Sequence, residues 1–200
     1  MVETTRSATQ RPPAPAKVRI LGIANDLFYR DGIRTVGIDR LISDSAVTKA
    51  TFYKHYRSKD ILITDYMTAR HEASAAELDR LISHASDPVA GVRSFASSIA
   101  AEIAGSAFRG DAFLNAAAEF SDPNHPVRRI VAEHRDAYTE RLVELTRALG
   151  HPAPGDAADD LMLARDGAMS GGYAGDPIAA TAALSRIVER VIAEARPAKK

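Results

Sequence analysis

The sequence contains no cysteine, which excludes a disulfide framework and a thiolate zinc site. It has no apolar run near the ~18 residues that a membrane span requires. Its first sixteen residues are polar and proline-rich, without the apolar segment that a signal peptide carries. We therefore expect a soluble cytoplasmic protein with no membrane partner. Its 200 residues suffice for one or two domains with a hydrophobic core.

Sequence patterns of the common enzyme classes are also missing. There is no phosphate-binding glycine loop and no HExxH zinc motif. The AMSGG segment around Ser170 is a weak match to a nucleophile elbow, because the leading glycine is missing and no strand precedes it. Five histidines are dispersed without the spacing of metal ligands: His71, His84, His125, His134 and His151. We expect no enzymatic activity, no metal and no cofactor.

No segment has the alternation of apolar and polar residues that is typical of a strand. Apolar residues instead recur at helical spacing along most of the chain. The pattern predicts an all-α fold of about nine helices, which we place at 17–31, 38–44, 48–56, 58–84, 88–103, 111–120, 127–149, 156–173 and 177–195.

The net charge is zero, but the charges are unevenly distributed. Residues 1–60 hold 11 Lys and Arg against 6 Asp and Glu, a balance of +5. Residues 61–200 hold the other 15 basic and 20 acidic residues, a balance of −5. A basic end on an acidic remainder is typical of a protein that meets DNA at one end. Chance clustering is the alternative explanation of this split.

The basic part contains two short helices joined by a tight turn, within residues 35–62. The turn is Ser45-Ala46-Val47, and Thr48 can cap the second of these helices with its hydroxyl. Ser58 can cap the long helix that follows, and Gly32 is placed to end the helix that precedes them. This layout predicts a helix-turn-helix, which places its second helix in the DNA major groove.

The segment GIRTVGIDRLISDSAVTKATFYKHYRSKDIL resembles the DNA-binding domain of the tetracycline-repressor (TetR/AcrR) family of regulators. The most specific part is TFYKHY followed at once by a Ser-Lys-Asp helix start. The resemblance implies a recognition helix that binds double-stranded DNA, with Lys59 on the phosphate backbone and Gly37 contacting a phosphate through its N–H. The implied DNA-binding residues are Gly37, Thr48, Lys49, Thr51, Tyr53, Lys54, His55 and Lys59.

Four positions depart from the family pattern. Ala46 replaces the usual glycine of the turn, which demands more of the local backbone. Gly37 stands where a hydroxyl cap is usual, and Ile42 stands where a small residue is common. Ala50 replaces a frequent glycine of the recognition helix. These differences affect the spacing of the helices but leave the motif in place.

The resemblance also implies the domain organisation. A tail at 1–16, which its polar and proline-rich composition predicts to be disordered, would precede a helix-turn-helix domain at 17–63, a helical ligand-binding and dimerisation domain at 64–196 and a short tail at 197–200. The last two helices would form the interface of a homodimer. Their small and β-branched residues permit either that interface or a core within one chain: Ala164, Ala168, Gly171, Ile187, Val188 and Val191.

A cavity for a small-molecule effector would lie among apolar and aromatic residues of the larger domain. The candidates are Phe95, Ile99, Phe113, Phe120, His134, Tyr138, Met162 and Met169, with Arg135 as a further polar group. Packed core is the alternative for each of them. Together these features predict a ligand-responsive regulator, a repressor that is released from a palindromic operator by its effector. The competing hypothesis is a helical adaptor or small-molecule-binding protein with no DNA role.

Overall fold

The computed structural model describes residues 15–195, and this part of the chain contains nine helices and no strand. The all-α prediction is confirmed. The helices are α1 (Pro15–Asp31), α2 (Ile38–Asp44), α3 (Lys49–His55), α4 (Lys59–Ser83), α5 (Pro88–Ile103), α6 (Ala112–Glu119), α7 (Pro126–Ala148), α8 (Pro154–Ala174) and α9 (Pro177–Glu194). The helix expected from residue 17 begins two residues earlier, and most of both expected tails lies outside the described residues.

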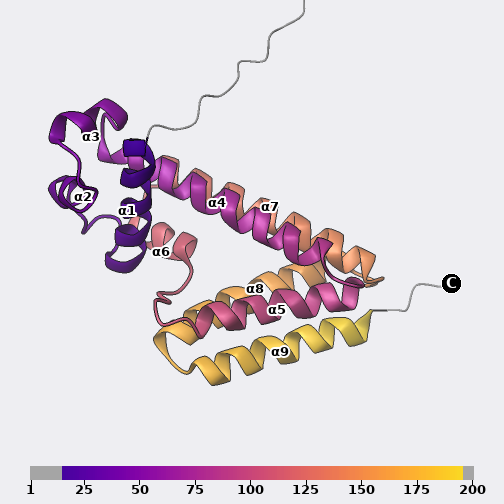
Figure 1. Ribbon diagram of the computed structural model, residues 1–200. Helices are drawn as coiled ribbons and strands as arrows, with labels where there is room; N and C mark the ends of the chain where they lie inside the picture. Colours follow the sequence, from indigo (N-terminus) through magenta and orange to yellow (C-terminus); the bar gives the residue numbers. More distant parts are fainter. Residues whose placement is uncertain (1–14, 196–200) are drawn as a thin grey trace, which may run out of the picture.

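Figure 1 shows a small head, α1–α3, at one end of a larger body, α4–α9. Within the body, α4 and α7 run side by side as a long arm that reaches the head. Helices α5, α8 and α9 pack together beside this arm. The short helix α6 lies between the head and the body. No helix among residues 15–195 is long and apolar enough to cross a bilayer.

Local hydrogen bonds explain where the helices of the head begin and end. The Thr48 hydroxyl accepts a hydrogen bond from the Thr51 N–H, and the Ser58 hydroxyl accepts one from the Ile61 N–H. Each satisfies an N–H that the first turn of a helix leaves free. Gly32 follows α1 with φ of +91°, the left-handed conformation that glycine adopts at least cost. The three predicted caps are therefore confirmed.

Two hydrophobic cores hold the molecule together. The head core joins the three head helices to the first half of α4, to α6 and to the start of α7, with Phe52, Leu62 and Phe113 among its members. The body core contains the rest of the arm together with α5, α8 and α9. Because α4 and α7 contribute to both cores, the arm connects the head to the body through continuous packing.

The structure places most of the small residues of α8 and α9 inside one chain. Ala164, Ala168, Val188 and Val191 are buried in the body core, the alternative that the sequence left open. Helix α5 approaches α8 so closely that a Cβ on Gly172 would lie 2.8 Å from a methyl carbon of Ile103. Small residues therefore allow close packing here, but between helices of the same chain.

Replacement of alanine by glycine should have opposite effects on stability in the α2–α3 turn and in α3. Ala46 has φ of +51° and is the only non-glycine residue among residues 15–195 with positive φ. We expect Ala46→Gly to raise the free energy of unfolding by about 1 kcal/mol, because it relieves this strain. The matched control is Ala50→Gly on the exposed face of α3, which should lower it by about 1 kcal/mol. Urea unfolding measures both, and a decrease for Ala46→Gly would contradict the strain at the turn.

Candidate nucleic-acid interface

Helix α3 is fixed to the head by one apolar face. Phe52 and the following Tyr56 are fully buried and pack in the head core. Residues three and four positions apart lie on the same side of a helix, so this burial turns the remaining side chains of α3 outward. Tyr53 is 40% exposed, and Lys49 and Lys54 are exposed. The outer face of α3 therefore carries a phenol and two cations.

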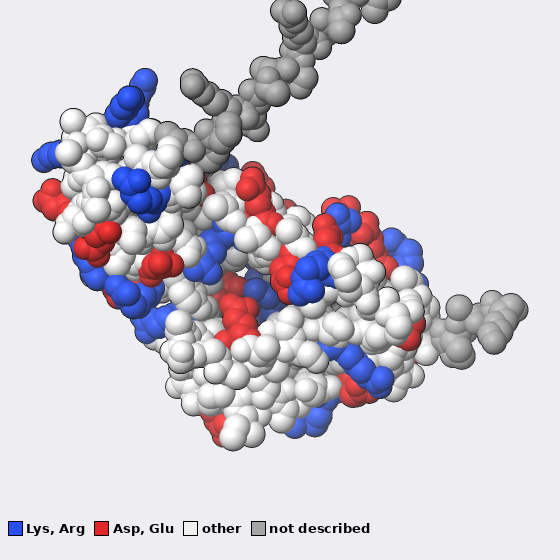
Figure 2. All heavy atoms as spheres, viewed as in Figure 1, with Lys and Arg blue, Asp and Glu red and all other residues white. Residues whose placement is uncertain are grey.

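The cations of α3 are free to meet another molecule. Within residues 15–195, neither Lys49 nor Lys54 forms an ion pair or a side-chain hydrogen bond. Figure 2 shows basic side chains projecting from the outer end of the head, with acidic side chains on its flank. Unpaired lysines on an exposed helix can replace the counterions of a phosphate backbone at little cost.

The hydroxyls of α3 are partly occupied by the fold itself. Thr48 caps the helix, and its Oγ1 lies 2.9 Å from the Oγ1 of Thr51. His55 is half-buried at the last turn. Gly37 caps α2 with extended backbone angles and no side-chain acceptor, so only backbone N–H groups are available there. These four residues lie on the head as the sequence predicts, and their contact with DNA stays a prediction.

Lys59 differs from the free lysines of α3. Its Nζ lies 3.4 Å from the carbonyl oxygen of Arg34, to which it donates, and 5.7 Å from the centre of the Phe28 ring. The side chain is half-buried, and desolvation lowers the pKa of Lys59. In the free protein Lys59 thus holds the α1–α2 loop, and it would have to leave Arg34 to contact a phosphate.

The expected effector residues do not all meet in one cavity. A cavity of about 370 Å³ lies in the body, and Ile99, Phe113 and Tyr138 line it. Phe120 lines a different hollow of about 310 Å³, beside Arg34 and Lys59. The other four candidates are buried in packed regions without lining either hollow: Phe95, His134, Met162 and Met169.

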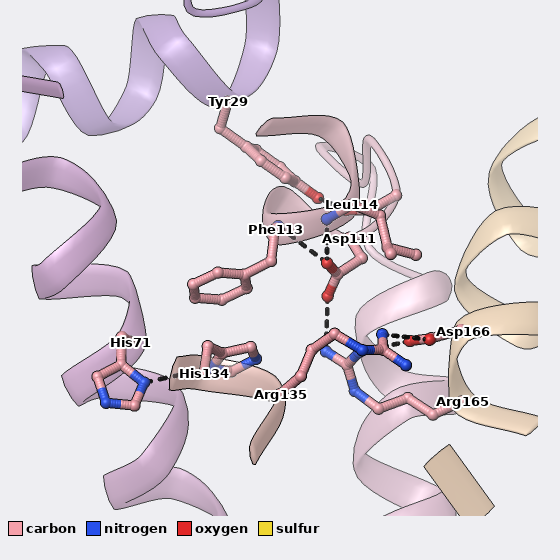
Figure 3. Close-up of polar contacts among 10 residues, drawn as sticks. Tyr29, His71, Asp111, Phe113, Leu114, His134, Arg135, Arg165 and Asp166 are labelled. Atoms are coloured by element: carbon pink, nitrogen blue, oxygen red, sulfur yellow. Dashed lines mark hydrogen bonds and ion pairs between the residues drawn. The ribbon is translucent and has the colours of Figure 1, made fainter. Parts of the chain in front are cut away.

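His134 illustrates why helical spacing cannot separate a cavity wall from a core. Its ring stacks on Phe113 with 3.5 Å between centroids, and its Nδ1 lies 3.4 Å from the Nδ1 of His71 (Figure 3). Desolvation, reinforced by the nearby Arg165, lowers the pKa of His134 to about 4. His134 is therefore a neutral packing group at neutral pH. A residue that lines a cavity and a residue that packs in a core both point inward from their helices. Only the packing of the other helices decides whether an inward side chain meets a cavity.

Two charged residues that sequence patterns did not indicate, Asp111 and Arg165, line the body cavity of about 370 Å³. Arg165 on α8 forms a buried ion pair with Asp111, with 2.7 Å between Nη2 and Oδ2 (Figure 3). The other carboxylate oxygen of Asp111 accepts hydrogen bonds from the N–H groups of Phe113 and Leu114, and so caps α6. In the sequence, the position of Arg165 among the inward-facing apolar residues of α8 could have indicated a buried charge. Its partner is 54 positions away and could not be identified from spacing.

The opposite end of α6 holds the head through a second carboxylate. The Glu119 side chain accepts hydrogen bonds from two successive N–H groups, those of Ile33 at 2.9 Å and Arg34 at 2.7 Å. These groups follow Gly32, whose positive φ helps to aim successive N–H groups at one anion. Arg34 also donates to the main-chain oxygen of Glu119. The α1–α2 loop and α6 are therefore joined at one point by a charge-assisted clamp.

Comparison with known proteins agrees with this geometry. The family model for bacterial regulatory proteins of the tetR family matches residues 20–65. A TetR-family transcriptional regulator from Streptomyces coelicolor is 37% identical, with a TM-score of 0.86 over 90% of this chain and 95% of that one. No curated protein matches the sequence.

More distant structures share the fold. A TetR-family regulator from Agrobacterium tumefaciens is 21% identical, with a TM-score of 0.78 over 88% of this chain and 96% of that one. NemR of E. coli, in its reduced form, is 18% identical, with a TM-score of 0.76 over 92% of this chain and 100% of that one. The family match and the 37% identical relative establish that the chain belongs to the TetR family of bacterial transcriptional regulators.

Proposed function

We propose that the protein is a repressor that binds a palindromic operator as a homodimer and is released by a small-molecule effector. Its family membership makes it a DNA-binding regulator of transcription rather than an enzyme. The observation that carries the proposal is the outer face of α3, where Lys49, Tyr53 and Lys54 are exposed opposite a buried aromatic face. Such a protein would act in the cytoplasm, where it meets the chromosome.

A homodimer would explain the exposed apolar side chains of the last two helices. Leu163 on α8 is 72% exposed and Ile178 near the start of α9 is 82% exposed. A second copy related by a two-fold axis would bury the same face of both chains. The two heads would then meet successive major grooves, ~34 Å apart. A palindromic operator follows from this symmetry.

Helix α6 offers a route from the effector cavity to the head. Asp111 at its N-cap is paired with Arg165 at the cavity, and Glu119 at its last turn holds the α1–α2 loop. An effector that disturbs the cavity end would tilt or shift α6 and thereby reorient the head. In a dimer this change alters the separation of the two recognition helices, so the favoured state no longer fits the operator.

Selection of bound sites from random duplexes tests the whole proposal. We expect the full-length protein to enrich inverted repeats, because a two-fold dimer contacts two equivalent half-sites. The enriched duplex then serves as the operator for the measurements below. Recovery of single half-sites without symmetry would contradict the dimeric arrangement, and no enrichment at low salt would contradict DNA binding.

Lys54→Ala should weaken binding to the operator and to unrelated duplexes alike. Because one phosphate contact is lost, the slope of log K against log salt should become shallower by about one. Fluorescence anisotropy at several salt concentrations measures it. The matched control is Arg80→Ala, which removes an exposed cation at the far end of α4 and should leave the slope unchanged. An unchanged slope for Lys54→Ala would place this lysine away from the backbone.

Tyr53→Ala should lower affinity for the operator without loss of helical structure, because the ring is 40% exposed and lies outside the head core, which it meets only through an edge-on contact with Phe52. Tyr53→Phe keeps the ring and removes the hydroxyl. If the hydroxyl donates to a phosphate or a base, both variants should lose about tenfold in operator affinity. If only the ring makes contact, with a thymine methyl group, Tyr53→Ala should lose this affinity and Tyr53→Phe should keep it. Full affinity in both variants would remove Tyr53 from the interface.

Glu119→Gln should loosen the head from the body, because an amide offers one acceptor oxygen to two N–H donors. We expect the free energy of unfolding to fall by about 1–2 kcal/mol and operator affinity to fall with it. Glu140→Gln on the exposed face of α7 is the matched control and should change neither quantity. If Glu119→Gln unfolds earlier but binds the operator with full affinity, the clamp stabilises the protein without orienting the head.

A further inference from the structure

The cavity of the body has a charged wall and an apolar wall. It lies between α4, α5, α7 and α8 and is about 370 Å³ in volume, within the range of small-molecule sites. Leu78, Leu81, Ile99 and Phe113 form much of the apolar side. Figure 2 shows acidic and basic side chains together in the hollow between the arm and α5. The charged lining residues are Arg70, Glu77, Glu102, Asp111 and Arg165.

Three of these five charges are neutralised by the protein itself. Asp111 and Arg165 form the buried ion pair described above. Glu77 pairs with Arg80 through two hydrogen bonds of 2.8 and 2.6 Å on the exposed side of α4. Arg70 and Glu102 remain. In the described part of the chain, neither of them has an ion-pair partner within 4.0 Å.

Arg70 is positioned but incompletely satisfied. Its guanidinium lies over the Tyr29 ring at 4.5 Å and over the Tyr66 ring at 5.6 Å. Stacking engages the face of the guanidinium, whereas its N–H groups lie in the plane and need acceptors. The Nε atom is buried and has no acceptor within residues 15–195. An unsatisfied buried donor is costly, and an anion that draws the Arg70 guanidinium into the cavity would offer acceptors to its N–H groups.

Glu102 presents the opposite charge to the same cavity from α5. The residue is exposed, so its carboxylate is accessible to a small molecule. Partial desolvation in the hollow raises the pKa of Glu102; Arg165 and, more weakly, Arg70 oppose this rise, and Asp111 reinforces it. The carboxylate is therefore less well hydrated than it would be in water, and a ligand cation in contact with it would compensate for the lost hydration.

We propose that this cavity binds a small zwitterion, with its anionic group on Arg70, its cationic group on Glu102 and its apolar body against the wall that contains Leu78 and Phe113. A singly charged ligand would satisfy one of the two unpaired groups and leave the other without a partner. This inference rests on the proposed effector-responsive function and specifies the chemistry of the effector.

The position of Arg70 also connects such a ligand to the head. The Tyr29 ring on which it stacks belongs to α1. The Tyr29 hydroxyl donates to the carbonyl oxygen of Gly110 and accepts from the N–H of Arg109, at the loop that precedes α6. An anion that draws Arg70 into the cavity would weaken its contact with Tyr29, so ligand binding and the placement of α1 are coupled.

Three probes with one phenyl ring separate the charge requirements. Phenylalanine carries both charges, 3-phenylpropionate only the anion, and phenethylamine only the cation. Isothermal titration calorimetry on the full chain measures their affinities. We expect phenylalanine to bind about tenfold more tightly than either of the others, because each charge-assisted hydrogen bond contributes roughly one factor of ten. Equal affinity for all three, or no binding of any, would overturn the proposal.

Variants then assign each charge to its residue. Arg70→Gln should lower the affinity for phenylalanine to that for phenethylamine, and Glu102→Gln should lower it to that for 3-phenylpropionate. Glu77→Gln is the matched control, because Glu77 lines the cavity but is already paired, and the order of the probes should not change. Affinities are compared among the three probes within each variant. A general loss of stability would weaken all three probes alike and would not change their order. An unchanged order in Arg70→Gln or Glu102→Gln would overturn the assignment.

Operator binding distinguishes this inference from the proposed function. A protein that binds its selected operator but prefers no zwitterion retains the regulatory function and contradicts the ligand class. A protein that prefers the zwitterion but binds no duplex supports the ligand class and contradicts the operator function. Release of the operator by phenylalanine, and not by the two singly charged probes, would support both.

Discussion

The buried ion pair between Arg165 and Asp111 is the interaction on which the arrangement of head and body depends. Both side chains are nearly inaccessible, at 8% and 4% exposure. Burial alone would raise the pKa of Asp111, but Arg165 and the N–H of Leu114 hold it below its usual range. Burial alone would likewise lower the pKa of Arg165, and the neighbouring Asp111 outweighs this effect. Each charge is tolerated because the other is present, so loss of one partner would leave an unpaired buried ion.

Helix α6 is held by a carboxylate at each end, Asp111 of this ion pair at its start and Glu119 at its last residue. An acidic residue is favourable at the start of a helix, where Asp111 caps α6, and unfavourable at its end, where Glu119 lies. The two N–H groups of the α1–α2 loop compensate Glu119. The unfavourable position of Glu119 at the end of α6 is therefore outweighed by its contact with the α1–α2 loop. Both ends of α6 are thus tied to other segments by carboxylates, and this is the basis of the route proposed from the cavity to the head.

The parts of the structure that sequence could predict are those that local interactions determine. The caps at Thr48 and Ser58 and the positive φ of Gly32 each depend on residues within a few positions, and all were predicted. The inward direction of Phe52 follows from helical spacing in the same way. The family resemblance added the arrangement of the helices in space.

Contacts between distant segments could not be predicted from local patterns. The sequence placed Lys59 on the DNA backbone, but its half-buried position depends on Arg34 and Phe28, which other elements bring to it. Met162 and Ile99 are both buried in the body core, yet only Ile99 also lines the cavity. The clamp of Glu119 on Ile33 joins residues 86 positions apart. Only packing of the whole chain distinguishes these outcomes.

Pairing of charges explains how a protein with no net charge can present a cationic surface. Several carboxylates of the body are matched by arginines, as in Arg135–Asp166 and Arg93–Glu189. The lysines of α3 have no such partners within residues 15–195. Unpaired charge dominates the local field, since paired charges largely cancel beyond a Debye length of about 8–10 Å. The excess of acidic residues in the body would further disfavour its approach to phosphates, so that the head is the end that meets DNA.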